Sequence, residues 1–102
     1  MATIRTSLPI LDSAGKPANG KIYFEQSNQY VAAEGLVTTA RGIALITGGQ
    51  LTAEDGNSPL VIPTTPTDQI VTITQQISVS TPAVWTTQIP DLAEVEYSNL
   101  PR

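Results

Sequence analysis

A chain of 102 residues with a net charge of −4 and no cysteine is long enough for one small domain and offers no disulfide to hold it together. Its five basic residues lie scattered along the sequence, so they form no stripe that could neutralise phosphates, and we expect no nucleic-acid partner. No apolar run reaches the length of a membrane-spanning helix, and the stretch 4–11 is too short and too interrupted for a signal peptide, so we expect no membrane partner.

Short runs rich in Val, Ile and Thr recur about every ten residues, separated by Gly, Pro, Asn and Asp, which is typical of β-strands joined by turns. Hydrophobic residues make up 40% of the chain but aromatic residues only 5%, which indicates a core of aliphatic side chains with few large rings. In chain order, the expected strands are 3–10, 21–25, 36–39, 42–47, 50–53, 60–62, 69–79 and 84–89.

The segments between these strands carry turn chemistry. The pair Gly48-Gly49 predicts a two-residue hairpin turn between the strands on either side of it. Around Arg41-Gly42 the pattern fits either two strands or one bent strand. The segment 92–97 fits either a last short strand or a helical turn. The other connections are turns at 12–20, 54–59 and 64–68, a loop at 26–34 and a flexible tail at 98–102.

The clearest strand, 69–79, alternates apolar and polar side chains, which predicts one buried face and one exposed face. In the following strand, 84–89, Trp85 and Ile89 share one face, and we expect Trp85 at the centre of the core because a large ring on an inward face dominates packing. The expected core comprises Ile22, Phe24, Val71, Ile73, Ile77, Val79, Trp85 and Ile89.

No segment repeats its apolar residues at the spacing of a helix, so the chain is predicted to be all-β. About seven short strands in a chain of this length fit an antiparallel β-sandwich of immunoglobulin-like or prealbumin-like type. A jelly roll or a small barrel is the alternative. We expect one domain over 1–102.

The residues that most often carry catalysis are missing. The chain has no histidine and no cysteine, which removes the commonest general base, the thiol nucleophile and the usual zinc ligands. The carboxylate pairs Glu54/Asp55 and Glu94/Glu96 lie in or beside turns, where acidic residues are usually solvated. The loop at 54–57 is interpreted as a glycine-centred turn and not as a calcium site. We therefore expect no enzyme, no cofactor and no metal.

Candidate interface residues come from exposed aromatic and cationic side chains. Tyr23 has parity opposite to Ile22 and Phe24, so it should face away from the core, where a tyrosine suits a protein interface. Tyr30 and Arg41 are the other candidates. Charged residues are only 14% of the chain, so contact with a neighbour requires little desolvation of charge. We therefore expect self-association, or many copies on a larger scaffold.

Several turn-and-strand patterns resemble a known group of proteins. Residues 20–25 (G-K-I-Y-F-E) resemble the G-K-V-x-F strand opening of small β domains in phage structural proteins, and 49–63 is similar to their G-x-L … L-x-I-P stretch. The strands 71–79 and 85–91 look like the pair that ends such domains, and 94–101 resembles their closing run. The resemblance is to N-terminal domains of tail-fibre or minor tail proteins of tailed phages and to related stand-alone virion modules.

The resemblance implies a β-sandwich that serves as a structural protein on the outer surface of a virion, synthesised in the host cytoplasm. The implied partners are major capsid or tail proteins. Because the chain is short and self-contained, a capsid decoration or head-surface protein is the first expectation. A tail-fibre attachment domain is the second. A carbohydrate- or cell-surface-binding module is the third, since sandwich folds often host such modules.

Overall fold

The computed structural model describes residues 2–32, 35–78 and 81–100, and these residues form ten β-strands and one short 3-10 helix. The strands are β1 (Ala2–Arg5), β2 (Gly20–Gln26), β3 (Tyr30–Ala32), β4 (Gly35–Val37), β5 (Gly42–Thr47), β6 (Gln50–Ala53), β7 (Leu60–Ile62), β8 (Val71–Ile77), β9 (Ala83–Thr87) and β10 (Glu94–Glu96), and the helix η1 is Tyr97–Asn99.

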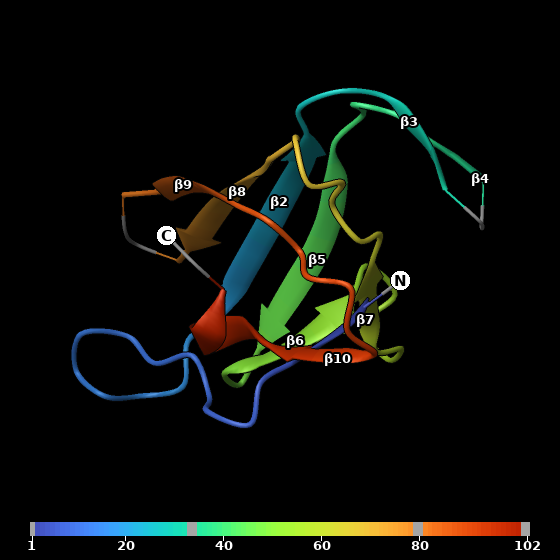
Figure 1. The fold of residues 1–102 in the computed structure, drawn as a ribbon. Coiled ribbons are helices and arrows are strands. Elements are labelled where there is room, and N and C mark those ends of the chain that lie inside the picture. The colour runs from blue at the N-terminus through green and yellow to red at the C-terminus, as the bar shows by residue number, and fades with distance from the viewer. Residues whose placement is uncertain (1, 33–34, 79–80, 101–102) are drawn as a thin grey trace.

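The strands form two sheets that face each other and one small hairpin (Figure 1). The larger sheet has five strands in the order β6-β5-β2-β8-β9, antiparallel throughout, and the smaller has the order β10-β1-β7. In Figure 1 the β3–β4 hairpin reaches outward at the upper right, away from both sheets. The predicted all-β sandwich is confirmed, and the described strands close no barrel.

The hairpin turn between β5 and β6 follows directly from its two glycines. Gly48 and Gly49 have φ angles of 57° and 81°, and Thr47 pairs with Gln50 across the turn. Two successive positive φ angles define the turn type whose twist matches that of the flanking strands, and glycine adopts them without strain. The predicted two-residue hairpin is confirmed, and the structure resolves 36–39 and 42–47 into two separate strands.

The core fills the space between the two sheets. Ile22, Val71, Ile73 and Ile89 are among its most deeply buried side chains. The smaller sheet supplies its own inward residues, including Ala2 and Ile4 of β1, Leu60 and Ile62 of β7, and Val95 of β10. Phe24 and Ile77 are partly buried against this cluster. Val79, another predicted core residue, lies outside the described residues.

The predicted central position of Trp85 is wrong. Its side chain is only partly buried and packs against the core from β9, which is an edge strand of the larger sheet. Its ring lies 6.2 Å from that of Tyr97, with the two planes tilted by 59°. Among the described strands β9 pairs only with β8, and the ring of Trp85 is enclosed less completely than Ile73 on β8.

Several predicted boundaries also change. The expected strand 3–10 ends at Arg5, where β1 reaches its last paired residue. The expected loop 26–34 contains β3, and its strand partner is β4. The segment 92–97 contains both expected alternatives, a short strand and the start of a helical turn. The tail prediction is wrong at Leu100, which is 4% exposed and belongs to the core, because η1 turns the chain back onto the sandwich.

Tyr97 gives a direct test of this packing at the chain's end. Its hydroxyl donates a 2.7 Å hydrogen bond to Oε1 of Gln75 on β8, while its ring is buried. The variant Tyr97→Phe keeps the ring and removes the donor. We expect it to lower the free energy of unfolding by about 1 kcal/mol in urea denaturation, the usual net value of one such bond. An unchanged value would show that the bond does not stabilise the fold.

Glu96 makes the stability of the smaller sheet depend on pH. Its carboxylate accepts hydrogen bonds from the backbone N–H of Leu8 and of Ser7, each 3.0 Å long, just after β1 pairs in parallel with β10. These bonds lower the pKa of Glu96 below its usual 4.5, and the bond from Leu8 has the largest effect. The ionised form is therefore favoured in the folded chain.

A lowered folded-state pKa adds stability that is present above the ordinary pKa of 4.5 and is lost as the pH falls through the lowered value. We expect the free energy of unfolding to decrease over that acidic range in the unmodified chain and to change less in Glu96→Gln. The control Glu54→Gln replaces an exposed carboxylate on the turn after β6. Thermal unfolding measured from neutral to acidic pH gives the pH dependence of stability for each protein. The same pH dependence in all three proteins would contradict the assignment of the lowered pKa to Glu96.

Candidate interface on the larger sheet

The face of the larger sheet that points away from the core forms one continuous surface, here called the outer face. Strand register places side chains on it in rows that cross the sheet. One row runs from Ile43 through Tyr23 and Thr74 to Val84. The outer face comprises Lys21, Tyr23 and Glu25 of β2, Ile43 and Leu45 of β5, Thr72, Thr74 and Gln76 of β8, and Val84 and Thr86 of β9.

Tyr23 and Arg41 meet on this surface. The Arg41 guanidinium lies over the Tyr23 ring, 5.0 Å from its centroid, and its Nε is 3.2 Å from Oε1 of Glu25. Both charged side chains are about half exposed, so the ion pair and the cation–π contact each add only about 0.5–1 kcal/mol. The cation–π contact holds the ring of Tyr23 in place. The ion pair with Glu25 neutralises the charge of Arg41 on this surface.

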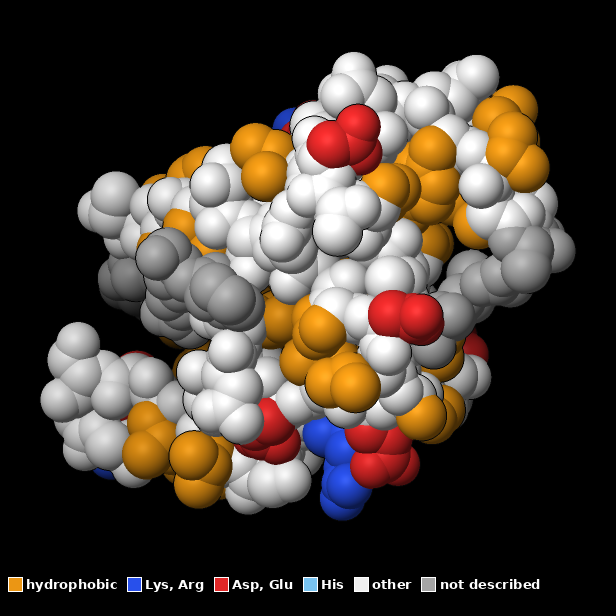
Figure 2. Space-filling model, viewed as in Figure 1, with side chains coloured by type: hydrophobic (Ala, Val, Ile, Leu, Met, Phe, Trp, Pro, Cys, Tyr) orange, Lys and Arg blue, Asp and Glu red, His pale blue; other side chains and the backbone are white. Residues whose placement is uncertain are grey.

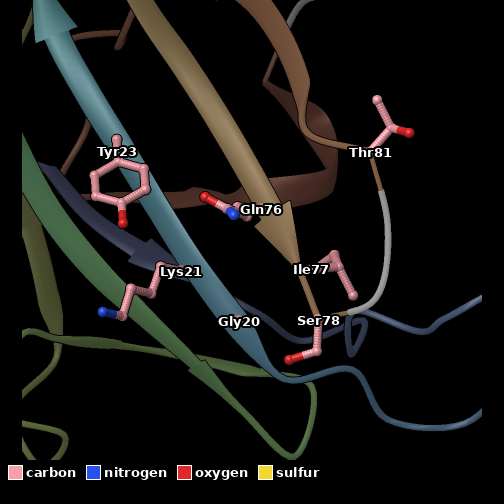
Figure 3. A pocket seen from close by; sticks show the side chains of 7 residues that line it. All are labelled: Gly20, Lys21, Tyr23, Gln76, Ile77, Ser78 and Thr81. Carbon is pink, nitrogen blue, oxygen red and sulfur yellow. The ribbon is translucent and has the colours of Figure 1, made fainter.

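A shallow groove of about 570 Å³ lies beside Tyr23, toward the end of β8 (Figure 3). Figure 3 shows Lys21 and Tyr23 on the same side of β2, with Gln76 reaching out from the neighbouring strand. Its lining residues are Gly20, Lys21, Tyr23, Gln76, Ile77, Ser78 and Thr81. The lining contains hydroxyl, amide and ammonium groups but no carboxylate, so it can hydrogen-bond a polar or weakly anionic group.

The third predicted interface residue, Tyr30, lies elsewhere. It belongs to β3, and its hydroxyl donates a 2.9 Å hydrogen bond to the backbone carbonyl of Thr64. The side chain is partly buried and ties the projecting hairpin to the connector after β7. The structure therefore brings Tyr23 and Arg41 together and assigns Tyr30 a structural contact.

The β3–β4 hairpin carries exposed apolar side chains that the sequence analysis missed. Val31 and Leu36 are 82% and 58% exposed, and they lie directly opposite each other in the strand pair. Figure 2 shows hydrophobic side chains gathered at the upper right, where this hairpin lies. The sequence signal for this hairpin was the two short apolar runs that form β3 and β4. Treating 26–34 as a loop concealed the first of these runs.

Three of the four carboxylates considered as chemical candidates, Asp55, Glu94 and Glu96, are engaged in local structure. Asp55 accepts a side-chain bond from Ser58 and backbone bonds from Ser58 and Asn57, which lower its pKa to about 2. Glu94 forms a 2.7 Å ion pair with Arg5. Among residues 2–32, 35–78 and 81–100, no three acidic side chains gather where they could hold a metal ion. The same residues include no helix long and apolar enough to cross a membrane.

Comparison with known proteins returns no relative. No family model matches the sequence, and neither a curated protein nor a solved structure matches it. The fold and the outer face are therefore the observations from which a function is inferred.

Proposed function

We propose that this chain is a non-enzymatic structural protein that docks on a larger assembly through the outer face of its larger sheet. The observation that carries the proposal is the row centred on Tyr23, with Arg41 over its ring. Tyrosine and arginine are enriched where protein interfaces concentrate their binding energy. Here Tyr23 lies in the middle of β2, the central strand of the larger sheet, beside the β-branched side chains of Ile43 and Thr74.

The outer face is also easy to desolvate. Its charged side chains are Lys21, Glu25 and Arg41, and the last two pair with each other. Burying unpaired charge is costly, whereas burying aliphatic side chains is favourable and a threonine hydroxyl costs little when it keeps a hydrogen bond in the interface. A surface of this kind suits a protein that binds a neighbour by shape and by many weak contacts.

The proposal of a non-enzymatic role rests on residue chemistry. With no histidine and no cysteine, carboxylates are the main remaining candidates for acid–base catalysis. Asp55 is fixed within its turn, and Glu96 accepts backbone hydrogen bonds beside β1. A lowered pKa keeps these groups ionised, which is the opposite of what a general acid needs near neutral pH.

For the setting, we propose the virion of a tailed phage, as the resemblance of the strand-and-turn patterns implies. Capsid decoration is the first position within it, and attachment of a tail fibre is the second. A glycan-binding module is the competing function, and the polar groove beside Tyr23 favours it. Against it, Arg41 covers one face of the Tyr23 ring, and that ring would otherwise serve as the platform for a sugar.

The proposal is tested by measuring how this chain binds to phage heads and to phage tails. These are separated from particles that were made without this gene. We expect the unmodified chain to bind one of these saturably. Tyr23→Ala should weaken binding by roughly tenfold or more, as loss of a central interface aromatic does. The control Val31→Ala removes an exposed apolar side chain from the hairpin and should bind normally. Binding to a glycan array with none to heads or tails would favour the competing function, and equal binding by Tyr23→Ala would overturn the docking face.

A further inference from the structure

Asn19 and Gly20 form the one asparagine–glycine dipeptide of the sequence. An asparagine carboxamide reacts most readily with the main chain when glycine follows it, because glycine has no side chain to hinder the approach of the backbone nitrogen. The dipeptide lies where the connector from β1 enters β2, and Asn19 is exposed there. Water can therefore reach the carboxamide.

Hydrogen bonds hold this dipeptide in place. Oδ1 of Asn19 accepts the N–H of Gly48 in the β5–β6 turn at 3.0 Å, and the backbone carbonyl of Asn19 accepts the N–H of Ser78 at 3.0 Å. Gly20 pairs with Ile77 of β8, and Figure 3 shows it at the start of β2 beside that strand. A side chain and a backbone fixed in this way cannot turn toward each other. The reaction therefore requires this end of β2 to open.

We propose that Asn19 is a deamidation site, which strand pairing keeps unreactive and which reacts when this end of β2 opens. The backbone nitrogen of Gly20 attacks Cγ of Asn19, the Cγ–Nδ2 bond breaks, and the proton of the attacking nitrogen leaves with the amide group as ammonia. Water then opens the cyclic imide. Attack of water at Cγ gives aspartate. Attack at the backbone carbonyl carbon gives isoaspartate, whose main chain runs through Cβ and Cγ and is longer by one methylene group.

The two products differ in how they fit the fold. Aspartate keeps an oxygen where Gly48 donates its hydrogen bond, so β2 can pair as before. Isoaspartate lengthens the main chain directly before Gly20, where a single added Cβ would already lie 2.1 Å from the backbone carbonyl oxygen of Gln76. An extra main-chain carbon at this point displaces β2 from its register with β8. Opening followed by isoaspartate formation is therefore irreversible, and the packing that requires glycine at position 20 also retains the reactive dipeptide.

The first measurement compares the reaction in the folded and in the unfolded chain. The unmodified chain is kept at mildly alkaline pH with and without urea, and peptide mapping by mass spectrometry follows position 19. We expect the reaction to be slower by roughly tenfold or more in the folded chain, because its rate follows the fraction of molecules that are open. A synthetic peptide of residues 16–22 in the same two solutions gives the effect of urea itself. Equal rates in the folded and unfolded chain, after this correction, would overturn the control by strand pairing.

The second measurement separates the products by refolding. The chain that has reacted in urea is diluted into buffer, folded and unfolded molecules are separated by size-exclusion chromatography, and position 19 is mapped in each fraction. We expect asparagine and aspartate in the folded fraction and isoaspartate in the unfolded one. The variant Asn19→Asp supplies the first product in pure form and should unfold at a near-normal urea concentration. Isoaspartate in the folded fraction, or strong destabilisation by Asn19→Asp, would overturn the account of the products.

Discussion

Replacing Ile73 with alanine is expected to lower the free energy of unfolding by about 3–4 kcal/mol, the range found when a large aliphatic side chain is removed from a closed core. Ile73 is 1% exposed and lies in the middle of β8, between Phe24 on β2 and Trp85 on β9. Because neighbours on both sides are fixed by strand register, the cavity cannot collapse easily. A loss of this size is a large part of the total stability of a small domain, which is about 5–15 kcal/mol.

Urea denaturation followed by the fluorescence of Trp85, the single tryptophan, measures this effect. The matched control is Val84→Ala on the neighbouring strand, where the side chain is 63% exposed. We expect the control to change the free energy of unfolding by about 0.5 kcal/mol or less, as surface substitutions do. A loss at position 73 no larger than that at position 84 would contradict the assignment of the inner face of β8.

The second large effect is expected from Gly20→Ala, at about 3 kcal/mol or more. A Cβ at this position would lie 2.1 Å from the backbone carbonyl oxygen of Gln76 and 2.9 Å from Cα of Ile77. Both atoms belong to β8, which pairs with β2 at this point. Backbone cannot move aside as a flexible side chain can, so the two strands must separate where the polar groove begins.

Lys21→Ala is the control for Gly20→Ala because it alters the adjacent residue of β2 on the exposed face. Chemical denaturation should show a near-normal midpoint for the control and a strongly lowered one for Gly20→Ala. If Gly20→Ala unfolded at the same denaturant concentration as the unmodified chain, the close approach of β2 and β8 would be wrong.

Local sequence signals predicted much of the larger sheet. The alternation around Val71 and Ile73 identified the buried face of β8, and Gly48-Gly49 identified the tightest turn, because both depend on neighbouring residues alone. The parallel pairing of β1 with β10 joins the two ends of the chain, and no local pattern indicates it. The depth of Trp85 also depends on strand order, which places β9 at an edge of the larger sheet.

The candidate interface was predictable to a similar extent. The parity of β2 placed Tyr23 on the outer face without any knowledge of its neighbours. The position of Arg41 over its ring follows from the pairing of β2 with β5, which brings Arg41 and Glu25 together. Tyr30 could not be separated from Tyr23 by sequence, because its role follows from a hydrogen bond to the distant Thr64.

Because the chain contains no cysteine, a single cysteine can be introduced as its one thiol. This allows a direct test of the docking face. Gln76→Cys places the thiol at an exposed position on the outer face, and Val31→Cys places it on the projecting hairpin. Each variant is bound to phage heads or tails and treated with a maleimide, and the labelling rate is compared with that of the free protein. The proposed docking face predicts that the thiol at position 76 becomes strongly protected while the one at position 31 still reacts. Protection at position 31 with full reactivity at position 76 would contradict it.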